Sequence, residues 1–403
     1  MPDQPLRGLT VLDLTENIAG PYCTKLLADF GADVIKVERP GTGDPTRRMA
    51  PFFHDEPHPE RSGPFLHLNT NKRGITLDLE VAAGRRIFLE LARTADVLVE
   101  SFAPGVLPSL GLGHEALRSI NPRLVKTSIS NFGQDGPYRD YQSSEIVTYA
   151  LGGPMYATGL PDRAPLKLGG NVVQYQAGAV AAAATAIALW DAEATGRGER
   201  LDVSLMRVQA ASQDRRTTML LGYQYTGEIN ERRTPGSAPG GGVRPCADGY
   251  VNINGSAARF PLTVRMIGQP ELLSAPLFKD EVARSRPGVS EEFDAYYIPF
   301  LMEHSKRECF ELSQAFHIPS GPIYDMADVL GDAHFQERDY WLRTDHAGVG
   351  QLTQPGRPFI MNRSPWAFRR PAPGLGQHNE AVLCGVLGYS PLDLARLRRL
   401  GVI

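Results

Sequence analysis

The chain has 403 residues, of which 42% are hydrophobic and 22% are charged, and its formal net charge is −3 at pH 7. This composition is typical of a globular protein, and the length allows two or three domains or one large elaborated domain. The weak negative charge provides no overall attraction to nucleic acid or to an anionic membrane, so we expect neither as a partner.

The first 135 residues alternate between strand-like and helix-like patterns. Helical periodicity covers residues 20–30, with Pro21 in the first turn, and residues 83–93. Runs rich in β-branched residues predict strands at 10–15, 32–38, 95–100 and 123–130. This alternation predicts an α/β fold with a mostly parallel sheet, in which ligands bind at the carboxyl ends of the strands.

Each of these strands is followed by a loop rich in glycine and proline, which suits close approach of the backbone to a ligand. The loops are residues 16–21, 39–44, 101–105 and 131–137. Arg39 stands at the end of the second strand, where its guanidinium is placed to bind phosphate. The alternative is a surface ion pair with Glu38 or Asp44. The chain has no G-x-x-x-x-G-K-[ST] string and no G-x-G-x-x-G after its first strand, which argues against a P-loop and a dinucleotide site.

The remainder of the chain divides at a polar stretch rich in glycine and proline, residues 225–244. Before it, residues 177–190 predict a long apolar helix and residues 200–205 a further strand. After it, residues 248–318 predict a smaller α/β region. We therefore predict boundaries that give three segments, 1–224, 225–318 and 319–403.

The four cysteines are far apart in the sequence and form no C-x-x-C pair, so the sequence predicts neither a metal site nor a disulfide framework. The N-terminus has no signal-peptide pattern, and the longest apolar run, 177–190, is shorter than the roughly 18 residues of a membrane span. We expect a cytoplasmic protein.

Several strings resemble class III CoA-transferases, the family of formyl-CoA and carnitine CoA-transferases. They include LRGLTVLDLT at 6–15, AGPYCT at 19–24, LADFGADVIKVER at 27–39 and NTNKRGITLD at 69–78. DVLVESFAPG at 96–105, TGRG at 195–198 and IPSGPIYDMADVL at 318–330 continue the match. The resemblance covers nearly the whole chain in the order of the family.

The resemblance implies an architecture that spacing alone does not predict. A large domain would form from residues 1–224 and 319–403 and hold a Rossmann-like sheet, with a smaller domain in residues 225–318. Each subunit would be an open ring, and two rings would interlock as a dimer. The partner would be a second copy of this chain or a homologous subunit.

The resemblance also implies that coenzyme A, as acyl-CoA, is a substrate, and that no prosthetic group is needed. Matching CoA-contact positions are Ile18, Arg39, Asn69, Asn71, Lys72, Arg73, Ser101, Phe102, Ser130, Asn131 and Phe132. Phe102 could instead belong to the core. Two positions depart from formyl-CoA transferase, which has glutamine at Ile18 and lysine at Ser130. Gly240, Gly241 and Gly242 resemble the mobile glycine loop over its active site; the alternative is a flexible connector.

The most informative departure is Gln174, which stands where the family keeps a nucleophilic aspartate. In the family, that carboxylate attacks the donor thioester to form a mixed anhydride, CoA thiolate converts it to an aspartyl-CoA thioester, and the acceptor carboxylate resolves it. An amide cannot do this, and no Asp or Glu occurs from Arg163 to Trp190. Glu145 matches an acidic position at the active site of formyl-CoA transferase, and it could orient substrate, act as base or nucleophile, or cap local backbone.

Three hypotheses follow from Gln174. In the first, the chain is a subunit of a CoA-transferase that acts on an organic carboxylic acid, and a homologous subunit supplies the aspartate, as in the benzylsuccinate CoA-transferase pair. In the second, it is a homodimeric enzyme that uses Glu145. In the third, it binds acyl-CoA without catalysis. The racemase branch of the family is disfavoured, because its His and Asp match Ser144 and Gln174 here.

Overall fold

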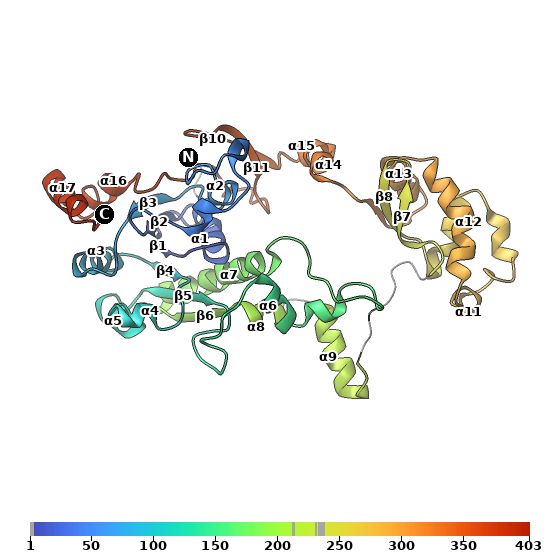
Figure 1. Ribbon diagram of the computed structural model, residues 1–403, viewed down its shortest axis with the longest axis horizontal. Helices are drawn as coiled ribbons and strands as arrows, with labels where there is room; N and C mark the ends of the chain where they lie inside the picture. The colour runs from blue at the N-terminus through green and yellow to red at the C-terminus, as the bar shows by residue number, and fades with distance from the viewer. Residues whose placement is uncertain (1–3, 212–213, 230–231, 233–237) are drawn as a thin grey trace. The chain divides into compact units, whose positions relative to one another are not determined.

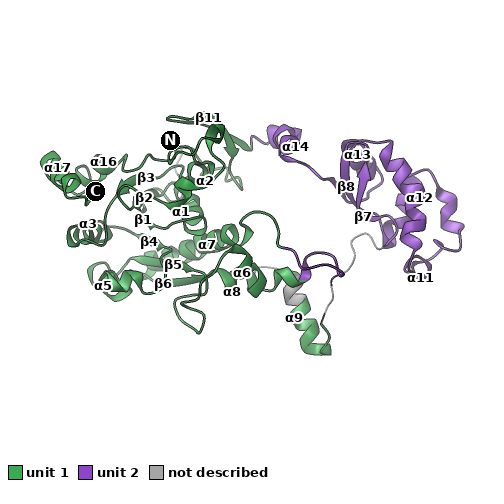
Figure 2. Ribbon diagram, in the orientation of Figure 1, with its two compact units in different colours: residues 1–156, 167–229, 340–403 green, residues 157–166, 230–339 purple. Residues whose placement is uncertain are grey.

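A computed structural model of the chain describes residues 4–211, 214–229, 232 and 238–403 (Figure 1). It divides into two compact units (Figure 2). Unit 1 comprises residues 1–156, 167–229 and 340–403, and unit 2 comprises residues 157–166 and 230–339. The sequence placed the ends of the middle segment at 225 and 318, whereas residues 319–339 and 157–166 cluster with unit 2 in the structure.

Unit 1 is built on a six-stranded sheet in which every neighbouring pair is parallel. The strand order is β3-β2-β1-β4-β5-β6, so the chain works outward from β1 in one direction and from β4 in the other. The strands are β1 Thr10–Leu14, β2 Asp33–Glu38, β3 Arg73–Thr76, β4 Val97–Glu100, β5 Val125–Ser130 and β6 Arg200–Ser204. The predicted α/β fold with a mostly parallel sheet is therefore confirmed.

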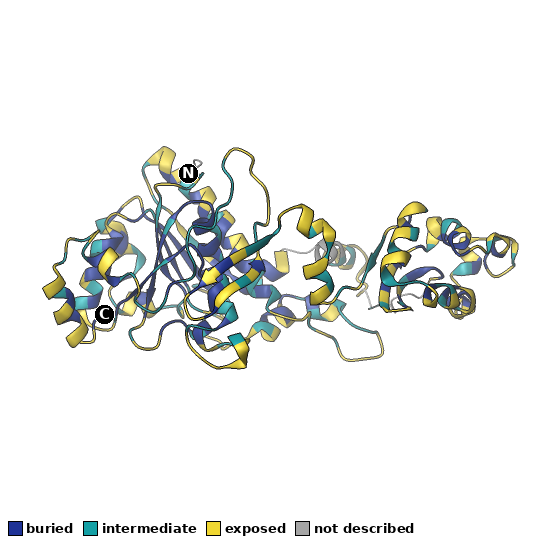
Figure 3. Cartoon of the chain, turned by 90° about the horizontal axis from the view of Figure 1, so that it is seen from above, coloured by how far each residue is buried: buried dark blue, intermediate teal, exposed yellow. Residues whose placement is uncertain are grey.

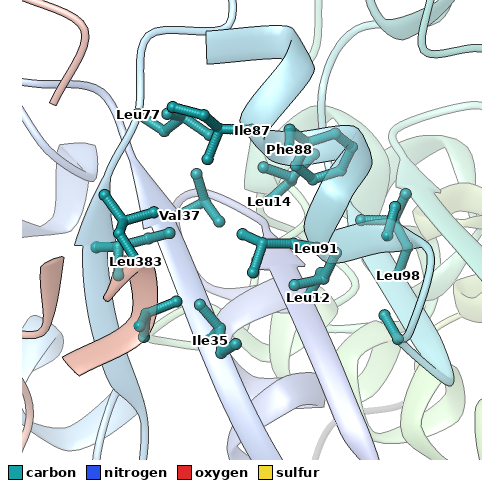
Figure 4. Packing of buried hydrophobic residues seen from close by; sticks show 14 of the residues in the cluster. Leu12, Leu14, Ile35, Val37, Leu77, Ile87, Phe88, Leu91, Leu98 and Leu383 are labelled. Atoms are coloured by element: carbon teal, nitrogen blue, oxygen red, sulfur yellow. The ribbon is translucent and has the colours of Figure 1, made fainter. Parts of the chain in front are cut away.

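Helices cover both faces of this sheet because successive strand residues point to opposite sides. On one face, Leu12 and Leu14 of β1 pack with α3 (Ala82–Ala92) and with α16 (Asn379–Leu383) (Figure 4). The C-terminal helix α17 (Pro391–Arg399) belongs to the same hydrophobic cluster. On the other face, Val11 packs with α1 (Ala19–Asp29) and α7 (Val172–Thr195). Figure 3 shows the buried strands between helices whose outer surfaces are exposed.

The helix α7 lies directly against α1. A Cβ added at Gly178 would lie 2.5 Å from the carbonyl oxygen of Ala19, so only glycine allows this approach. α7 is 24 residues long and contains an 18-residue window with a mean hydropathy of 1.4, so it is long and apolar enough to cross a membrane by length and composition. Because one side of α7 belongs to the core of unit 1, we interpret it as a core helix.

Unit 1 also contains further helices and one more pair of strands. They are α2 Gly63–Leu68, α4 Val106–Ser109, α5 His114–Ile120, α6 Glu145–Leu151, α8 Leu205–Ala211, α9 Asp214–Thr226, β10 Trp341–His346 and β11 Gly350–Pro355. β10 and β11 form an antiparallel hairpin.

Unit 2 combines an antiparallel sheet of order β7-β8-β9 with short helices. The strands are β7 Gly241–Cys246, β8 Gly249–Asn254 and β9 Ser320–Pro322. The helices are α10 Phe260–Met266, α11 Glu281–Arg284, α12 Val289–Met302, α13 Lys306–Ala315, α14 Met326–Gly331 and α15 Ala333–Glu337. An aromatic cluster of Phe260, Phe278, Phe293 and Tyr297 fills its core.

Candidate active site

A cavity opens at the carboxyl end of the sheet in unit 1, and we call it the switch-point pocket. Its volume is about 310 Å³. Because strand order reverses between β1 and β4, this is the crevice where open parallel sheets bind ligands. Its lining residues are Glu16, Asn17, Ala19, Ser101, Phe102, Ala103, Pro104, Ile129, Ser130, Asn131, Arg139, Asp140, Tyr141, Gln142, Gln174 and Leu205.

A second cavity, which we call the Arg39 pocket, follows the ends of β1, β2 and β3 and has a volume of about 510 Å³. Glu16 and Phe102 line both cavities, so the two pockets adjoin. Arg39 pairs with Glu80 at 2.6 Å, and both side chains are more than half exposed. The expected surface ion pair is thus present, but with Glu80 in place of Glu38 or Asp44. An exposed pair of this kind is weak, which leaves the guanidinium free to exchange partners.

Gln174 is brought to the switch-point pocket by the first turn of α7. It is the third residue of that helix, which begins at Val172. Negative charge is favoured at a helix N-terminus because the first backbone N–H groups have no partner within the helix. The amide of Gln174 leaves this position, where the family resemblance leads us to expect a carboxylate, without a charge.

The side chain of Glu145 contacts the same N-terminal end of α7. Its Oε1 accepts a hydrogen bond of 2.8 Å from the backbone N–H of Val173, so its carboxylate caps α7. Its Oε2 is enclosed and makes no hydrogen bond. Glu145 does not line the switch-point pocket in the described residues. The capping role, one of the alternatives raised by the sequence, is the one that this geometry favours.

The turn between β1 and α1 brings Glu16 between the two pockets. The backbone N–H of Glu16 donates to Oγ of Ser101 at 2.8 Å, which joins this turn to the loop that follows β4. Burial, and after it the Asp44 carboxylate, raises the pKa of the Glu16 carboxyl. Ile18, one of the predicted CoA-contact positions, is 3% exposed and does not line the pocket.

Asn69 and Lys72, predicted as CoA contacts, lie inside unit 1. Neither residue is exposed. The ammonium group of Lys72 donates to Asn69 Oδ1 at 2.9 Å and to Asp13 Oδ2 at 3.0 Å. Burial would raise the pKa of the Asp13 carboxyl, but the ammonium groups of Lys72 and Lys36 outweigh it and lower the pKa to about 2. These side chains satisfy one another, which favours a structural role.

Asn71 and Arg73 are also used within the unit. Asn71 donates to Asp29 Oδ1 at 2.7 Å and accepts from the backbone N–H of Arg369 at 2.6 Å, so it fastens the C-terminal segment. The guanidinium of Arg73 pairs with Asp33 on the adjacent strand, with Nε at 2.9 Å from Oδ1. Their contribution to CoA binding stays a prediction.

Five of the predicted CoA-contact positions line the two pockets. They are Arg39, Ser101, Phe102, Ser130 and Asn131. Phe102 also packs against the core, so both of its expected environments are present. Phe132 turns away to pack edge-on against Tyr138, with ring centroids 5.8 Å apart.

Sequence reasoning missed Glu16, Arg139 and Tyr141, which all line the switch-point pocket. Glu16 had a signal, because it directly follows a strand in a ligand-binding loop. Arg139 and Tyr141 had none, because their place depends on how a loop without periodicity folds back.

Gly240, Gly241 and Gly242 belong to unit 2. Gly241 and Gly242 begin β7 and pair with Asn254 and Ile253 of β8. Their role as a lid stays a prediction. Within the described part of the chain, no group of three or more His, Cys, Asp or Glu side chains is arranged to hold a metal ion.

The chain is similar to known proteins that are named as CoA-transferases. The sequence profile of CoA-transferase family III matches residues 6–379. The chain is 34% identical to the succinyl-CoA:(R)-benzylsuccinate CoA-transferase subunit BbsE of Thauera aromatica, over 99% of this chain and 98% of that protein. It is 33% identical to the succinyl-CoA–D-citramalate CoA-transferase of Chloroflexus aurantiacus, over 100% and 99%. The crystal structure of a CaiB/BaiF family protein from Brucella suis is similar, with a TM-score of 0.81 and 29% identity over 95% of this chain and 99% of that one.

Proposed function

This chain belongs to CoA-transferase family III, and on that premise we propose that it is a subunit of an enzyme that moves CoA from an acyl-CoA donor, such as succinyl-CoA, to an organic carboxylic acid. The catalytic aspartate comes from a homologous partner subunit. One observation carries the proposal: Gln174 occupies the pocket at the N-terminus of α7, where the family resemblance places the acyl-carrying carboxylate.

The two adjoining pockets support a division of CoA between them. The nucleotide end occupies the Arg39 pocket, where an arginine in a weak exposed pair can bind phosphate. The pantetheine arm passes Phe102 and Glu16, which line both pockets, and the acyl end reaches Gln174. This chain's residues bind and orient the thioester, while the covalent step belongs to the partner's carboxylate.

The proposal includes the family's quaternary arrangement, in which two ring-shaped subunits interlock. A relative that is itself named as a subunit, BbsE of Thauera aromatica, supports a two-subunit enzyme. Interlocked rings would also explain why a chain without the aspartate is retained, because its partner would fold around it.

The test is to express this chain alone and together with a family member that has the aspartate. We expect CoA transfer from succinyl-CoA only in the second preparation, and covalent CoA only on the partner. Full transfer activity from this chain alone would reject the partner requirement. Acyl-CoA binding without transfer in either preparation would favour a binding protein.

The alternative, a homodimeric enzyme that uses Glu145, rests on the Oε2 atom that makes no hydrogen bond. Glu145→Gln should then abolish turnover without unfolding the protein. Unchanged turnover would leave Glu145 with its capping role.

A further inference from the structure

The loop between β5 and α6, which has no regular secondary structure, is attached to the sheet at its start. The backbone N–H of Gly133 donates to Ser130 Oγ at 3.0 Å, and that of Gln134 donates to Asp202 Oδ2 at 2.9 Å. Both anchors are residues of sheet strands. These two hydrogen bonds fix the start of the loop that carries Arg139, which reduces the part of its backbone that ligand binding must order.

The side chain of Arg139 is seated against the loop that follows β4, with unused donor capacity. A Cβ at Gly105 would lie 3.0 Å from Nη2 of Arg139, so the missing side chain at Gly105 makes room for the guanidinium. Nε of Arg139 is enclosed and makes no hydrogen bond. The nearest carboxylate is Asp140, at 3.7 Å, and that side chain is 78% exposed. Such a contact is too long for a hydrogen bond and is screened by water.

The charge of Arg139 also differs from that of the other residues that line the switch-point pocket. Of the residues that line the switch-point pocket in the described part of the chain, it alone is positively charged. The other acid of the pocket, Glu16, is surrounded by a different set of charges. These are Asp44, Lys36, Arg39 and Arg48. The guanidinium of Arg139 therefore faces the cavity with the exposed Asp140 carboxylate, 3.7 Å from Nε, as a weak counterion.

We propose that Arg139 is a specificity-determining residue, whose guanidinium binds the free carboxylate of a dicarboxylic acyl group attached to CoA. The inference rests on the proposed function and names its acyl class. If the nucleotide of CoA occupies the Arg39 pocket, the cation of the other pocket faces the acyl end, where the free anionic group is the second carboxylate. A guanidinium fork matches that group in shape and charge.

The experiment measures binding of succinyl-CoA, butyryl-CoA and free CoA to the full chain by calorimetry. Butyryl-CoA has the same four acyl carbons and lacks the second carboxylate. We expect the wild-type chain to bind succinyl-CoA about 10- to 100-fold more tightly than butyryl-CoA, as charge-assisted hydrogen bonds allow. Arg139→Gln should reduce that ratio to about one and leave the affinities for butyryl-CoA and free CoA unchanged. Arg139→Lys, which keeps the charge and loses the fork, should give an intermediate ratio.

Arg39→Gln is the matched control, because it removes a guanidinium from the neighbouring pocket. It should weaken all three ligands by the same factor. If Arg139→Gln also weakened all three equally in a protein with unchanged thermal unfolding, Arg139 would be a phosphate contact and the inference would be wrong. A wild-type chain with no preference for succinyl-CoA would overturn it too, while the proposed function would stand. A folded wild-type chain that binds none of the three would contradict the proposed function, and this inference with it.

Discussion

At the scale of single residues, the proposed function depends on Gln174. The side chain of Gln174 lies at the third position of α7, where an ionised carboxylate would be favoured by the helix N-terminus. A glutamine places no charge at this helix end. Glu145 lies nearby, and its Oε1 is already used to accept a hydrogen bond from the backbone N–H of Val173.

Gln174→Asp should restore an acyl carrier. After incubation with succinyl-CoA, we expect intact-mass spectrometry to detect covalently bound CoA on the variant and none on the wild-type chain, with hydroxylamine removing the adduct. Gln174→Asn, which has the same length without the charge, is the control. An adduct on the wild-type chain purified without a partner would contradict the assignment of Gln174 as inactive.

A second prediction at this scale concerns His67 of α2. Burial, and after it the Lys25 ammonium group, lowers the pKa of the His67 ring to about 4. Above pH 6.5 the ring is neutral in both the folded and the unfolded chain, and this group does not affect stability. As the pH falls from 6.5 towards 4, the unfolded chain gains a proton that the folded chain excludes, so stability decreases.

We therefore expect His67→Gln to lose less stability than wild type between pH 7 and pH 5, by about 2 kcal/mol in the free energy of unfolding from urea titrations. His334→Gln, at an exposed ring, is the control and should behave as wild type. Equal losses for wild type and His67→Gln would show that the ring titrates alike in the folded and unfolded chains.

At the scale of secondary-structure elements, the hydrophobic pattern of the sequence predicted several strands and helices. The expected strand 32–38 corresponds to β2 Asp33–Glu38, and the expected helix 83–93 corresponds to α3 Ala82–Ala92. Buried parallel strands are continuous apolar runs, so they stand out. β3 Arg73–Thr76 was missed because it is four residues long and contains Arg73 and Gly74. The hairpin β10–β11 was missed because its residues are mostly polar.

The residues of the candidate site were likewise predicted only in part. Loops at strand ends were predicted as ligand-binding, and Arg39, Ser101 and Ser130 do line the pockets. Lys72 could not be placed from its polar neighbourhood, because its burial depends on Asp13, which is 59 residues away in sequence. Long-range pairing of this kind has no local signature.

The contact between α1 and α7 gives a prediction at the element scale. Gly178→Ala should destabilise the chain by about 1–3 kcal/mol, because its methyl group would meet the Ala19 carbonyl and force the helices apart. This cost exceeds the gain of about 1 kcal/mol from better helix propensity. Since Ala19 and Gln174 line the switch-point pocket, CoA binding should weaken as well.

Urea titration and calorimetry with CoA measure the two effects. Ala183→Ser, at an exposed position of the same helix, is the control; it should lower stability by no more than about 0.5 kcal/mol, through its lower helix propensity, and should leave CoA binding unchanged. A Gly178→Ala variant as stable as wild type would show that the two helices can shift without cost.

At the scale of the whole molecule, a single-chain description leaves one surface unexplained. Val180, Ile187 and Trp190 lie along one face of α7, at spacings that place them in a row, and they are 41%, 72% and 77% exposed. The opposite side of the helix is in the core of unit 1. Rows of exposed apolar side chains of this size mark interaction surfaces. In the proposed interlocked dimer, the second subunit would cover this row of α7, whether that subunit is a second copy of the chain or a homologue.

The double variant Ile187→Glu, Trp190→Glu should therefore convert the dimer to monomer, measured by light scattering coupled to size-exclusion chromatography. The free energy of unfolding of the monomer should be little changed, because both side chains are exposed within the chain. Leu392→Glu, at a leucine of α17 that is 71% exposed, is the matched control and should leave the dimer intact. A dimer that survives the double variant would place the interface elsewhere. If the wild-type chain sedimented together with lipid vesicles, the exposed row on α7 would be a membrane-binding surface. The membrane, and not a second subunit, would then cover it.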